Sequence, residues 1–446
     1  MSKFYDKINK NPEKVVANLA GIKLKYGLDE KPPLIDSLLY GLLWFAISLP
    51  TVIIVGKVVA GLHFGDLGTQ VHYMQKLFFL VAVSLLIQIF LGHKLPLVVG
   101  PATVLLVAIV AGQNSTIEDI YSAIMLGGAI LALLSITGLF AKLEKLFTSR
   151  VVAAILILIA LTLTPTILNL ILTVPQAGME LFHLCFALIF IMGMFLANKL
   201  LTGIWKSTLI VWALIAGSLI YLAFVPQYEW VGSFEYNTFS NFLRGTEFSF
   251  SLDLGVLISF LICFLALSIN DLGSIQSVGK LINPSNMSKR ITVGIAVTGL
   301  SNMLAGFLNV IGTVNFSLST GIIAANGIAS RFTLVPAAIG LLVISFLPKL
   351  VAFLGNIPVL IIGIVLLYIM CSQIAAGLIV AFGSKTFTFE DGLIIGLPLM
   401  LGIIVSFLPS HALKVFPPLL IPILGNGFVI GTLAVLFMEH VIYRHK

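Results

Sequence analysis

The chain has 446 residues, of which 59% are hydrophobic and only 10% are charged. A soluble globular domain carries roughly a quarter charged residues, so this composition excludes an ordinary water-soluble globule. The mean hydropathy of +1.12 predicts a polytopic, all-α membrane protein that has the lipid bilayer as its solvent. The net charge of +7 is spread over short loops, so no basic face for nucleic acid is expected.

The N-terminal tail, residues 1–33, is polar and lacks the apolar core and cleavage site of a secretory signal. The first apolar span is therefore expected to stay in the mature protein. Each of the three cysteines lies in an apolar run without metal-ligand spacing, which indicates packing rather than a disulfide or metal site. The motifs HExxH and GxSxG and a P-loop are absent, so an enzyme is not expected.

A helix rises 1.5 Å per residue, so about 20 apolar residues cross a hydrocarbon core of about 30 Å. By this measure the chain divides into about fourteen membrane segments. Full-length spans are expected near 36–58, 75–93, 119–140, 150–173, 179–198, 207–225, 252–270, 291–310, 332–354, 358–382, 391–408 and 419–442. The third and tenth segments, 95–112 and 311–328, are shorter and interrupted.

Lysine and arginine predict the orientation, because they are retained in short cytoplasmic loops. The N-terminal tail carries seven lysines, and the loop after the fourth span holds Lys142, Lys145 and Arg150. The longest connection, 226–251, carries three glutamates against one arginine. We therefore expect this loop outside the cell, both termini in the cytoplasm, and the protein in the plasma membrane. Lys57, late in the first span, is expected to extend toward the lipid headgroups.

Both short segments are predicted to be broken helices. In the first, Pro96 and Pro101 cannot donate backbone hydrogen bonds and Gly100 permits a break, which predicts an extended stretch and then a half-helix from about Thr103. In the second, residues 312–321 alternate apolar and polar side chains as an extended segment does, and 322–328 suit a half-helix. Short β-like stretches are therefore expected in spans three and ten.

The two breaks lie seven spans apart. Broken helices at matching positions of two halves indicate an inverted repeat with a solute site at the midplane, where half-helix N-termini present free N–H groups. The halves would be residues 34–225 and 252–446. The simpler alternative is a pair of kinked or re-entrant helices without a ligand; polar atoms in both segments favour the transporter.

Three stretches resemble the nucleobase/ascorbate transporter family, which includes the uracil and xanthine permeases. Residues 26–34 are similar to the family's opening before its first span, and residues 268–274 are placed like its Glu-x-x-Gly segment, with Gly273 as the glycine. The most specific stretch is similar to the signature Gln/Glu-Asn-x-Gly-x(4)-Thr-x(3)-Ser-Arg. It contains Leu318, Ser319, Thr320, Gly321, Asn326, Ser330 and Arg331.

The resemblance implies a seven-plus-seven inverted repeat, with a core domain from spans 1–4 and 8–11 and a gate domain from spans 5–7 and 12–14. It also implies a homodimer, substrate held partly by backbone amides of the two broken spans, and coupling to H⁺ or Na⁺ without another cofactor.

Polar residues of the family are altered here at three places in the chain. Leu43 and Trp44 stand where members have Gln-His, Asn270 stands at the glutamate of the eighth span, and Leu318 replaces Gln or Glu in the tenth. The Asn270 side chain offers one hydrogen-bond acceptor and two donors without a titratable proton. It therefore favours a neutral ring whose edges carry both hydrogen-bond donors and acceptors. The predicted site therefore uses Asn270 and backbone N–H groups near Thr103, Ser317 and Ser319, with Trp44 stacking on a planar ring.

Asp271 has two interpretations. A carboxyl group within a span is costly and predicts a coupling site for a proton or cation. Alternatively, Asp271 lies at the cytoplasmic end of the eighth span and caps the turn toward Gly273.

The sequence thus predicts a secondary-active permease for a nucleobase, with a purine such as xanthine, hypoxanthine, guanine or uric acid preferred to uracil. The alternative is an anion transporter on the same architecture for a carboxylate, sulfate or bicarbonate, because paired half-helix N-termini bind anions without acidic side chains.

Overall fold

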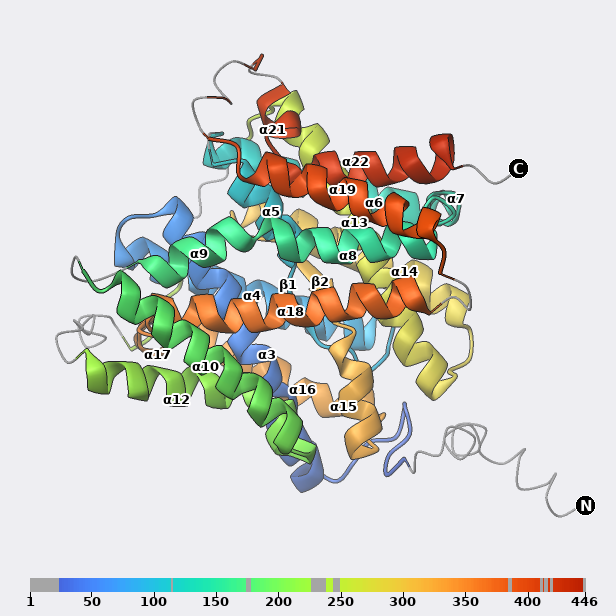
Figure 1. Ribbon diagram of the computed structural model, residues 1–446. Coiled ribbons are helices and arrows are strands. Elements are labelled where there is room, and N and C mark those ends of the chain that lie inside the picture. Colours follow the sequence, from blue (N-terminus) through green and yellow to red (C-terminus); the bar gives the residue numbers. More distant parts are fainter. Residues whose placement is uncertain are drawn as a thin grey trace, which may run out of the picture.

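The computed structural model describes residues 24–113, 115–173, 178–225, 238–243, 249–383, 387–409, 412, 416–417 and 420–443. These residues form a bundle of helices with two short strands near its centre (Figure 1). Most of the predicted N-terminal tail, and most of the predicted outer loop at 226–251, lie outside the described residues.

The first half contains one strand and ten helices within its described ranges. They are α3 (Leu34–His63), α4 (Leu67–Phe90), β1 (Val99–Pro101), α5 (Thr103–Ala111), α6 (Ile117–Ile136), α7 (Phe140–Glu144), α8 (Ser149–Thr162), α9 (Thr164–Leu172), α10 (Glu180–Leu200), α11 (Gly203–Ser207) and α12 (Leu209–Phe224).

The second half repeats the pattern of long helices around one short strand. Its elements are α13 (Leu254–Ile282), α14 (Met287–Phe307), β2 (Thr313–Asn315), α15 (Leu318–Asn326), η2 (Arg331–Leu334), α16 (Val335–Ser345), α17 (Pro348–Gly355), α18 (Val359–Phe382), α19 (Phe389–Ser406), α21 (Ile421–Leu424), α22 (Gly427–Phe437) and η4 (Met438–Ile442).

Nine helical segments of the described chain are long and apolar enough to cross a membrane, with α8 and α9 together forming one of them. A tenth results if η2–α16 and α17, which meet at 96°, count as one bent span. Two further apolar helices are shorter, Leu209–Phe224 and Gly427–Ile442. The structure therefore bears out a polytopic helical membrane protein.

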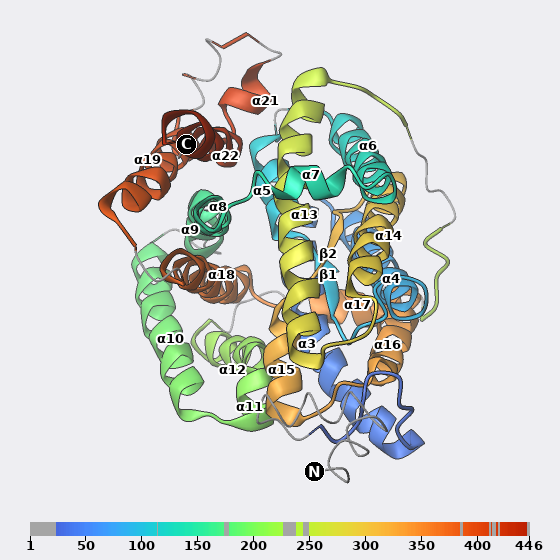
Figure 2. The same cartoon turned by 90° about the vertical axis from the view of Figure 1, so that its right-hand side faces the viewer.

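The helices form two groups that lie side by side in Figure 2. The strand group contains α3–α6 and α13–α17 together with β1 and β2; within it α6 packs on α14, and α4 on α16. The flanking group contains α8–α12, α18, α19 and α22; within it α8 packs on α18, and α19 on α22. The groups meet where α3 contacts α12 and α18, where α5 contacts α8 and α22, where α13 contacts α22, and where α15 contacts α11.

Glycines allow α6 and α14 to approach closely. A Cβ added at Gly128 of α6 would lie 2.6 Å from the carbonyl oxygen of Gly299, and one at Gly299 of α14 would lie 2.5 Å from the backbone nitrogen of Ala132. Small residues at such a crossing let two membrane helices pack through their backbones. This contact fixes α14, and through it the β2 side of the strand group.

We expect Gly128→Leu to destabilise the protein by about 1–3 kcal/mol or more, because the new side chain meets backbone atoms that cannot move aside. Thermal unfolding of the detergent-solubilised protein measures this effect. Gly193→Leu on α10 is the matched control, since a Cβ there meets no atom within 4 Å. Equal unfolding temperatures for the two variants would contradict the close α6–α14 crossing.

Several predicted boundaries were wrong for identifiable reasons. Helix α4 begins at Leu67 instead of 75, because the Asp66 carboxylate caps it by accepting from the Thr69 backbone N–H at 2.8 Å. Helix α13 continues to Ile282, twelve residues past the predicted end at 270. The expected span at 332–354 is bent by 96° between Ser345 and Pro348, because proline removes a helical N–H and clashes with the preceding turn.

Candidate substrate site

The two broken segments meet as an antiparallel pair of strands. Val99 lies opposite Asn315, Gly100 opposite Val314, and Pro101 opposite Thr313. The Phe316 N–H donates to the Val98 carbonyl at 2.8 Å, and the Ala102 N–H donates to the Gly312 carbonyl at 2.9 Å. The predicted β-like stretches are therefore confirmed.

A half-helix leaves each end of this ladder. Helices α5 and α15 extend in opposite directions from the strands (Figure 2), so both helix N-termini lie beside the ladder. Helix α5 begins at Thr103, as predicted, whereas α15 begins at Leu318, four residues before the predicted start. Neither N-cap residue, Ala102 or Ser317, makes a side-chain cap. The Leu105 N–H donates to the Ala102 carbonyl at 3.0 Å and the Ser319 N–H donates to the Phe316 carbonyl at 3.3 Å. The groups left for a ligand are therefore the N–H groups at Thr103 and at Ser317.

The predicted backbone contacts differ in their exposure. Thr103 is half-buried, Ser317 is exposed, and Leu318 is 40% exposed. Ser319 is fully buried, and its hydroxyl accepts a hydrogen bond of 3.0 Å from the Val98 N–H. In this conformation Ser319 therefore ties α15 to the stretch that precedes β1.

Phe316 joins β2 to α15, and sequence reasoning did not single it out. Its ring lies against Gly100 so closely that a Cβ at Gly100 would be 2.4 Å from the ring. The ring is only partly buried. The sequence feature that could have indicated Phe316 is its place as a single aromatic residue where an extended stretch meets a half-helix.

Asn270 and Asp271 are neighbours on α13 but face different surroundings, since consecutive residues are rotated by about 100° on a helix. Asn270 is half-buried, and its side-chain amide has no hydrogen-bond partner among the described residues. Asp271 is fully buried within α13, which continues through Gly273 to Ile282. The interpretation of Asp271 as a cap of a turn at Gly273 was therefore wrong.

The Asp271 carboxylate accepts three hydrogen bonds from the second broken segment and α14. The Asn315 backbone N–H donates at 3.0 Å and its side-chain Nδ2 at 2.6 Å, both to Oδ1, while the Thr298 hydroxyl donates to Oδ2 at 2.7 Å. Three donors suit an ionised carboxylate. Asp271 therefore fixes β2 to α13 and α14.

The network continues to the first broken segment through His93, which is fully buried. The Leu95 backbone N–H donates to His93 Nδ1 at 2.9 Å, so Nε2 carries the hydrogen and donates to Asn315 Oδ1 at 3.0 Å. Gln88 on α4 donates to the Thr298 hydroxyl at 3.0 Å. Sequence reasoning missed this network, although polar residues flanking both breaks were visible.

Leu43 and Trp44 lie inside the strand group. They are 5% and 1% exposed, and the indole Nε1 of Trp44 donates to the Thr333 hydroxyl of η2 at 3.0 Å. The ring that the sequence assigned to stacking is therefore packed against η2 in this conformation.

The opening stretch and the signature, far apart in sequence, lie side by side. The Arg331 backbone N–H donates to the Leu28 carbonyl at 3.1 Å, and the Ser330 hydroxyl donates to the Glu30 carbonyl at 2.6 Å. Arg331 Nε also pairs with the Asp29 carboxylate at 2.8 Å. These signature residues anchor the segment before α3.

The other signature residues lie along α13 and α15. Asn326 ends α15 and its side chain donates to the Ile322 carbonyl at 3.0 Å. Gly321 is exposed, and an added Cβ at Gly321 or Gly273 would meet no atom within 4 Å.

The prediction that Lys57 extends toward the lipid headgroups was wrong. Its ammonium donates to the carbonyls of Gly355 and Ile357, the latter at 2.8 Å. The carbonyls at a helix C-terminus carry partial negative charge, so the end of α17 holds the cation inside the protein.

Comparison with known proteins identifies the family. A family model described as "Permease family", for xanthine and uracil permeases, matches residues 36–411. A candidate purine permease of Clostridium perfringens is 25% identical over 436 residues, covering 94% of this chain and 93% of the relative. The xanthine permease of Bacillus subtilis is 24% identical over 400 residues, covering 85% of this chain and 87% of the relative.

The fold is also found among solved structures. The transmembrane domain of the cyanobacterial bicarbonate transporter BicA has a TM-score of 0.59 at 15% sequence identity, over 84% of this chain and 96% of that one. At this identity the likeness concerns the fold alone. With its apolar spans, the chain is thus a multi-pass membrane protein, and it belongs to the nucleobase permease family as a divergent member whose relatives are transporters and not enzymes.

Proposed function

We propose that the protein is a secondary-active permease for a nucleobase, with a purine preferred. One observation carries this proposal: the β1–β2 ladder brings two half-helix N-termini without side-chain caps to the centre of the strand group. Such N-termini bind small polar solutes through free N–H groups. Family membership supplies the class of solute.

The proposed site uses three kinds of contact. First-turn N–H groups at Thr103 and Ser317 donate to ring carbonyls, and the unpartnered amide of Asn270 pairs with a ring edge through one acceptor and two donors. The partly buried ring of Phe316, placed between β2 and α15, provides a face for stacking. A purine with oxo groups and ring N–H groups matches this set, and relatives named as xanthine and uric acid permeases support the choice.

The proposed transport cycle moves the strand group, as the core domain, against the flanking group, as the gate domain. The proposal includes fourteen spans as two inverted repeats of seven, cytoplasmic termini, the plasma membrane and a homodimer. The strand group meets the flanking group along α3, α5, α13 and α15 on its own side and along α8, α11, α12, α18 and α22 on the other. A sliding movement of one group would carry the ladder across the membrane without breaking β1 from β2.

For coupling, we assign Asp271, with H⁺ or Na⁺ as the coupling ion. The carboxylate accepts hydrogen bonds from the backbone N–H and the side-chain amide of Asn315 in β2, and Asn315 accepts one from His93. Arg290, which donates to the backbone carbonyl of His93 at 3.0 Å, is the charged group next to this network. Binding of a cation at Asp271 would therefore change the hydrogen bonds that hold β2 directly.

Uptake of radiolabelled xanthine, hypoxanthine, guanine, uric acid and uracil tests the proposal, in cells that lack their own permeases. We expect saturable accumulation of at least one purine, exceeding that of uracil. If surface expression is verified and none of the five compounds accumulates, the proposal is rejected.

The second candidate is an anion carrier on the same architecture. Asn270 and Leu318 stand where the family has acidic or amide side chains, so the proposed site presents no carboxylate to repel an anion. Competition separates the candidates: sulfate or bicarbonate in excess should leave purine uptake unchanged if the site is a nucleobase site, and should suppress it if the site prefers inorganic anions.

A further inference from the structure

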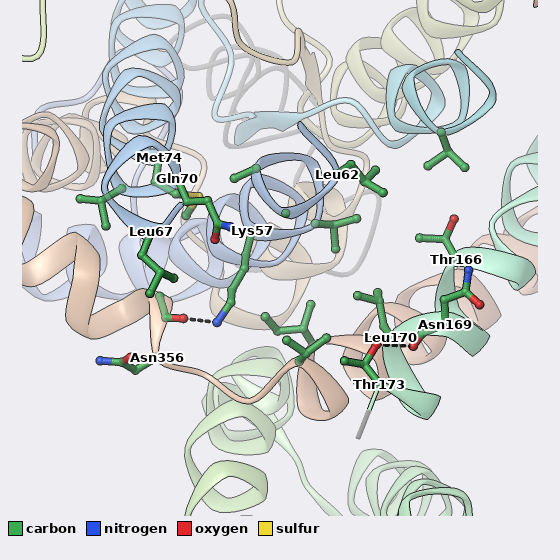
Figure 3. A pocket seen from close by; sticks show the side chains of 18 of the residues that line it. Lys57, Leu62, Leu67, Gln70, Met74, Thr166, Asn169, Leu170, Thr173 and Asn356 are labelled. Carbon is green, nitrogen blue, oxygen red and sulfur yellow. Dashed lines mark hydrogen bonds between the residues drawn. The ribbon is translucent and has the colours of Figure 1, made fainter. Parts of the chain in front are cut away.

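A pocket separate from the β1–β2 ladder lies at the far end of α3. It has a volume of about 600 Å³ and is bounded by α3, α4, α5 and α17 of the strand group and by α9 and α18 of the flanking group. Figure 3 shows Lys57 of α3 on one side and Thr166 and Asn169 of α9 on the other. A volume of this size accommodates a small organic molecule.

Lys57 gives the pocket its charge. No residue that lines the pocket in the described chain is acidic. The nearest acid along the chain, Asp66, is exposed and its carboxylate already caps α4. An ammonium has three hydrogens, and the carbonyls of Gly355 and Ile357 take two of them. The pocket therefore holds a partly buried cation with a donor to spare and no carboxylate facing it.

The other walls combine apolar surface with amide and hydroxyl groups. Val58, Met74 and Ile362 are apolar, while Gln70, Thr166 and Asn169 can pair with polar edges. The Nε2 of Gln70 donates to the Phe64 carbonyl at 2.8 Å, which fixes its amide at the rim. Apolar walls with a few placed polar groups are typical of sites for flat organic ligands.

We propose that this pocket is a second binding site, which takes a small organic anion by pairing its negative oxygen with the Lys57 ammonium. Under the proposed function, on which this assignment rests, the ligand is the anionic form of an oxopurine such as urate. Residues of both helix groups line the site, and the proposal places it on the path that a solute follows between them. It makes the protein select for the charge of the solute before the ladder is reached.

Transport kinetics of a charged and a neutral purine test this site. We expect Lys57→Gln to raise the KM for urate, an anion at neutral pH, about tenfold or more, since a charge-assisted hydrogen bond is lost. The KM for neutral hypoxanthine should change less than twofold. Lys57→Arg should keep the KM for urate near the wild-type value.

Lys349→Gln is the matched control, because it removes the same charge at the opposite, N-terminal end of α17, and Lys349 does not line the pocket. It should leave both KM values unchanged. An equal rise in KM for urate and hypoxanthine in Lys57→Gln, or no rise for urate, would overturn the proposal.

Ligand-dependent thermal unfolding of the full-length protein in detergent separates failure of this site from failure of the proposed function. Urate should raise the unfolding temperature of the wild type and of Lys349→Gln, and should raise it much less in Lys57→Gln, even if no nucleobase is transported. Equal stabilisation by urate in Lys57→Gln would reject the site. Stabilisation by sulfate as strong as that by urate would reject the oxopurine as its ligand.

Discussion

Asn270→Ala is expected to lower the kcat/KM for purine uptake by about 10- to 100-fold, with unchanged surface expression. A polar ligand edge that loses its partner in a buried site costs about 1–3 kcal/mol, and 1.4 kcal/mol corresponds to a factor of ten. The fold should tolerate the change, because the Asn270 amide has no partner among the described residues and is only half-buried. Initial uptake rates at several substrate concentrations measure the effect.

Gln276→Ala is the matched control for Asn270. It removes the same amide group from the same helix, and the six-residue offset turns it to a different face of α13. Uptake by this variant should remain within about twofold of wild type. If Asn270→Ala also keeps its affinity, then Asn270 does not belong to the substrate site.

Asp271→Ala is expected to prevent accumulation of folded protein. It would leave two buried N–H donors of Asn315 and the Thr298 hydroxyl without their acceptor. Each unsatisfied buried donor costs about 1–3 kcal/mol, and whole proteins are stable by only about 5–15 kcal/mol. Size-exclusion chromatography of the solubilised variant should show aggregated or degraded protein. A monodisperse peak with wild-type yield would contradict the network.

Asp271→Asn separates the structural role of this residue from its proposed coupling role. The amide keeps the shape and one acceptor, and the Thr298 hydroxyl can turn to accept from it. We therefore expect a folded protein that exchanges substrate across proteoliposomes but no longer accumulates it against a gradient. Concentrative uptake that still depends on the H⁺ or Na⁺ gradient would remove Asp271 as the coupling residue.

The sequence predicted the features that depend on local covalent chemistry. Pro96 and Pro101 lack the N–H that a helix interior uses, and Gly100 weakens a helix, so the first break and the start of α5 at Thr103 were predicted correctly. The apolar runs, likewise, are dictated by the lipid and predicted the long helices. The signature around Gly321 and Arg331 predicted the family.

Features that depend on side chains from distant segments were not predictable in this way. Asp271 bonds Asn315, which is 44 residues later in the chain. Asn315 in turn bonds His93, which is 222 residues earlier in the chain than Asn315. The side chain of Lys57 is held by carbonyls about 300 residues later in the chain. Sequence spacing contains no information about such contacts until the two halves have been packed together.

The helix ends were mispredicted for a related reason. Hydropathy marks where a segment leaves the lipid, whereas a helix ends where its backbone groups find other partners. Helix α13 continues beyond its apolar part to Ile282, and a left-handed Asn283 ends it. Asp66 starts α4 eight residues earlier than hydropathy alone indicated.

A structure determined with a bound purine tests the central claim most directly. We expect ligand density between the first turns of α5 and α15, with the ring within hydrogen-bond distance of the Asn270 amide and of backbone N–H groups at Thr103 or Ser317. Density remote from both half-helices, with α13 turned so that Asn270 faces lipid, would contradict the site and the proposed function built on it.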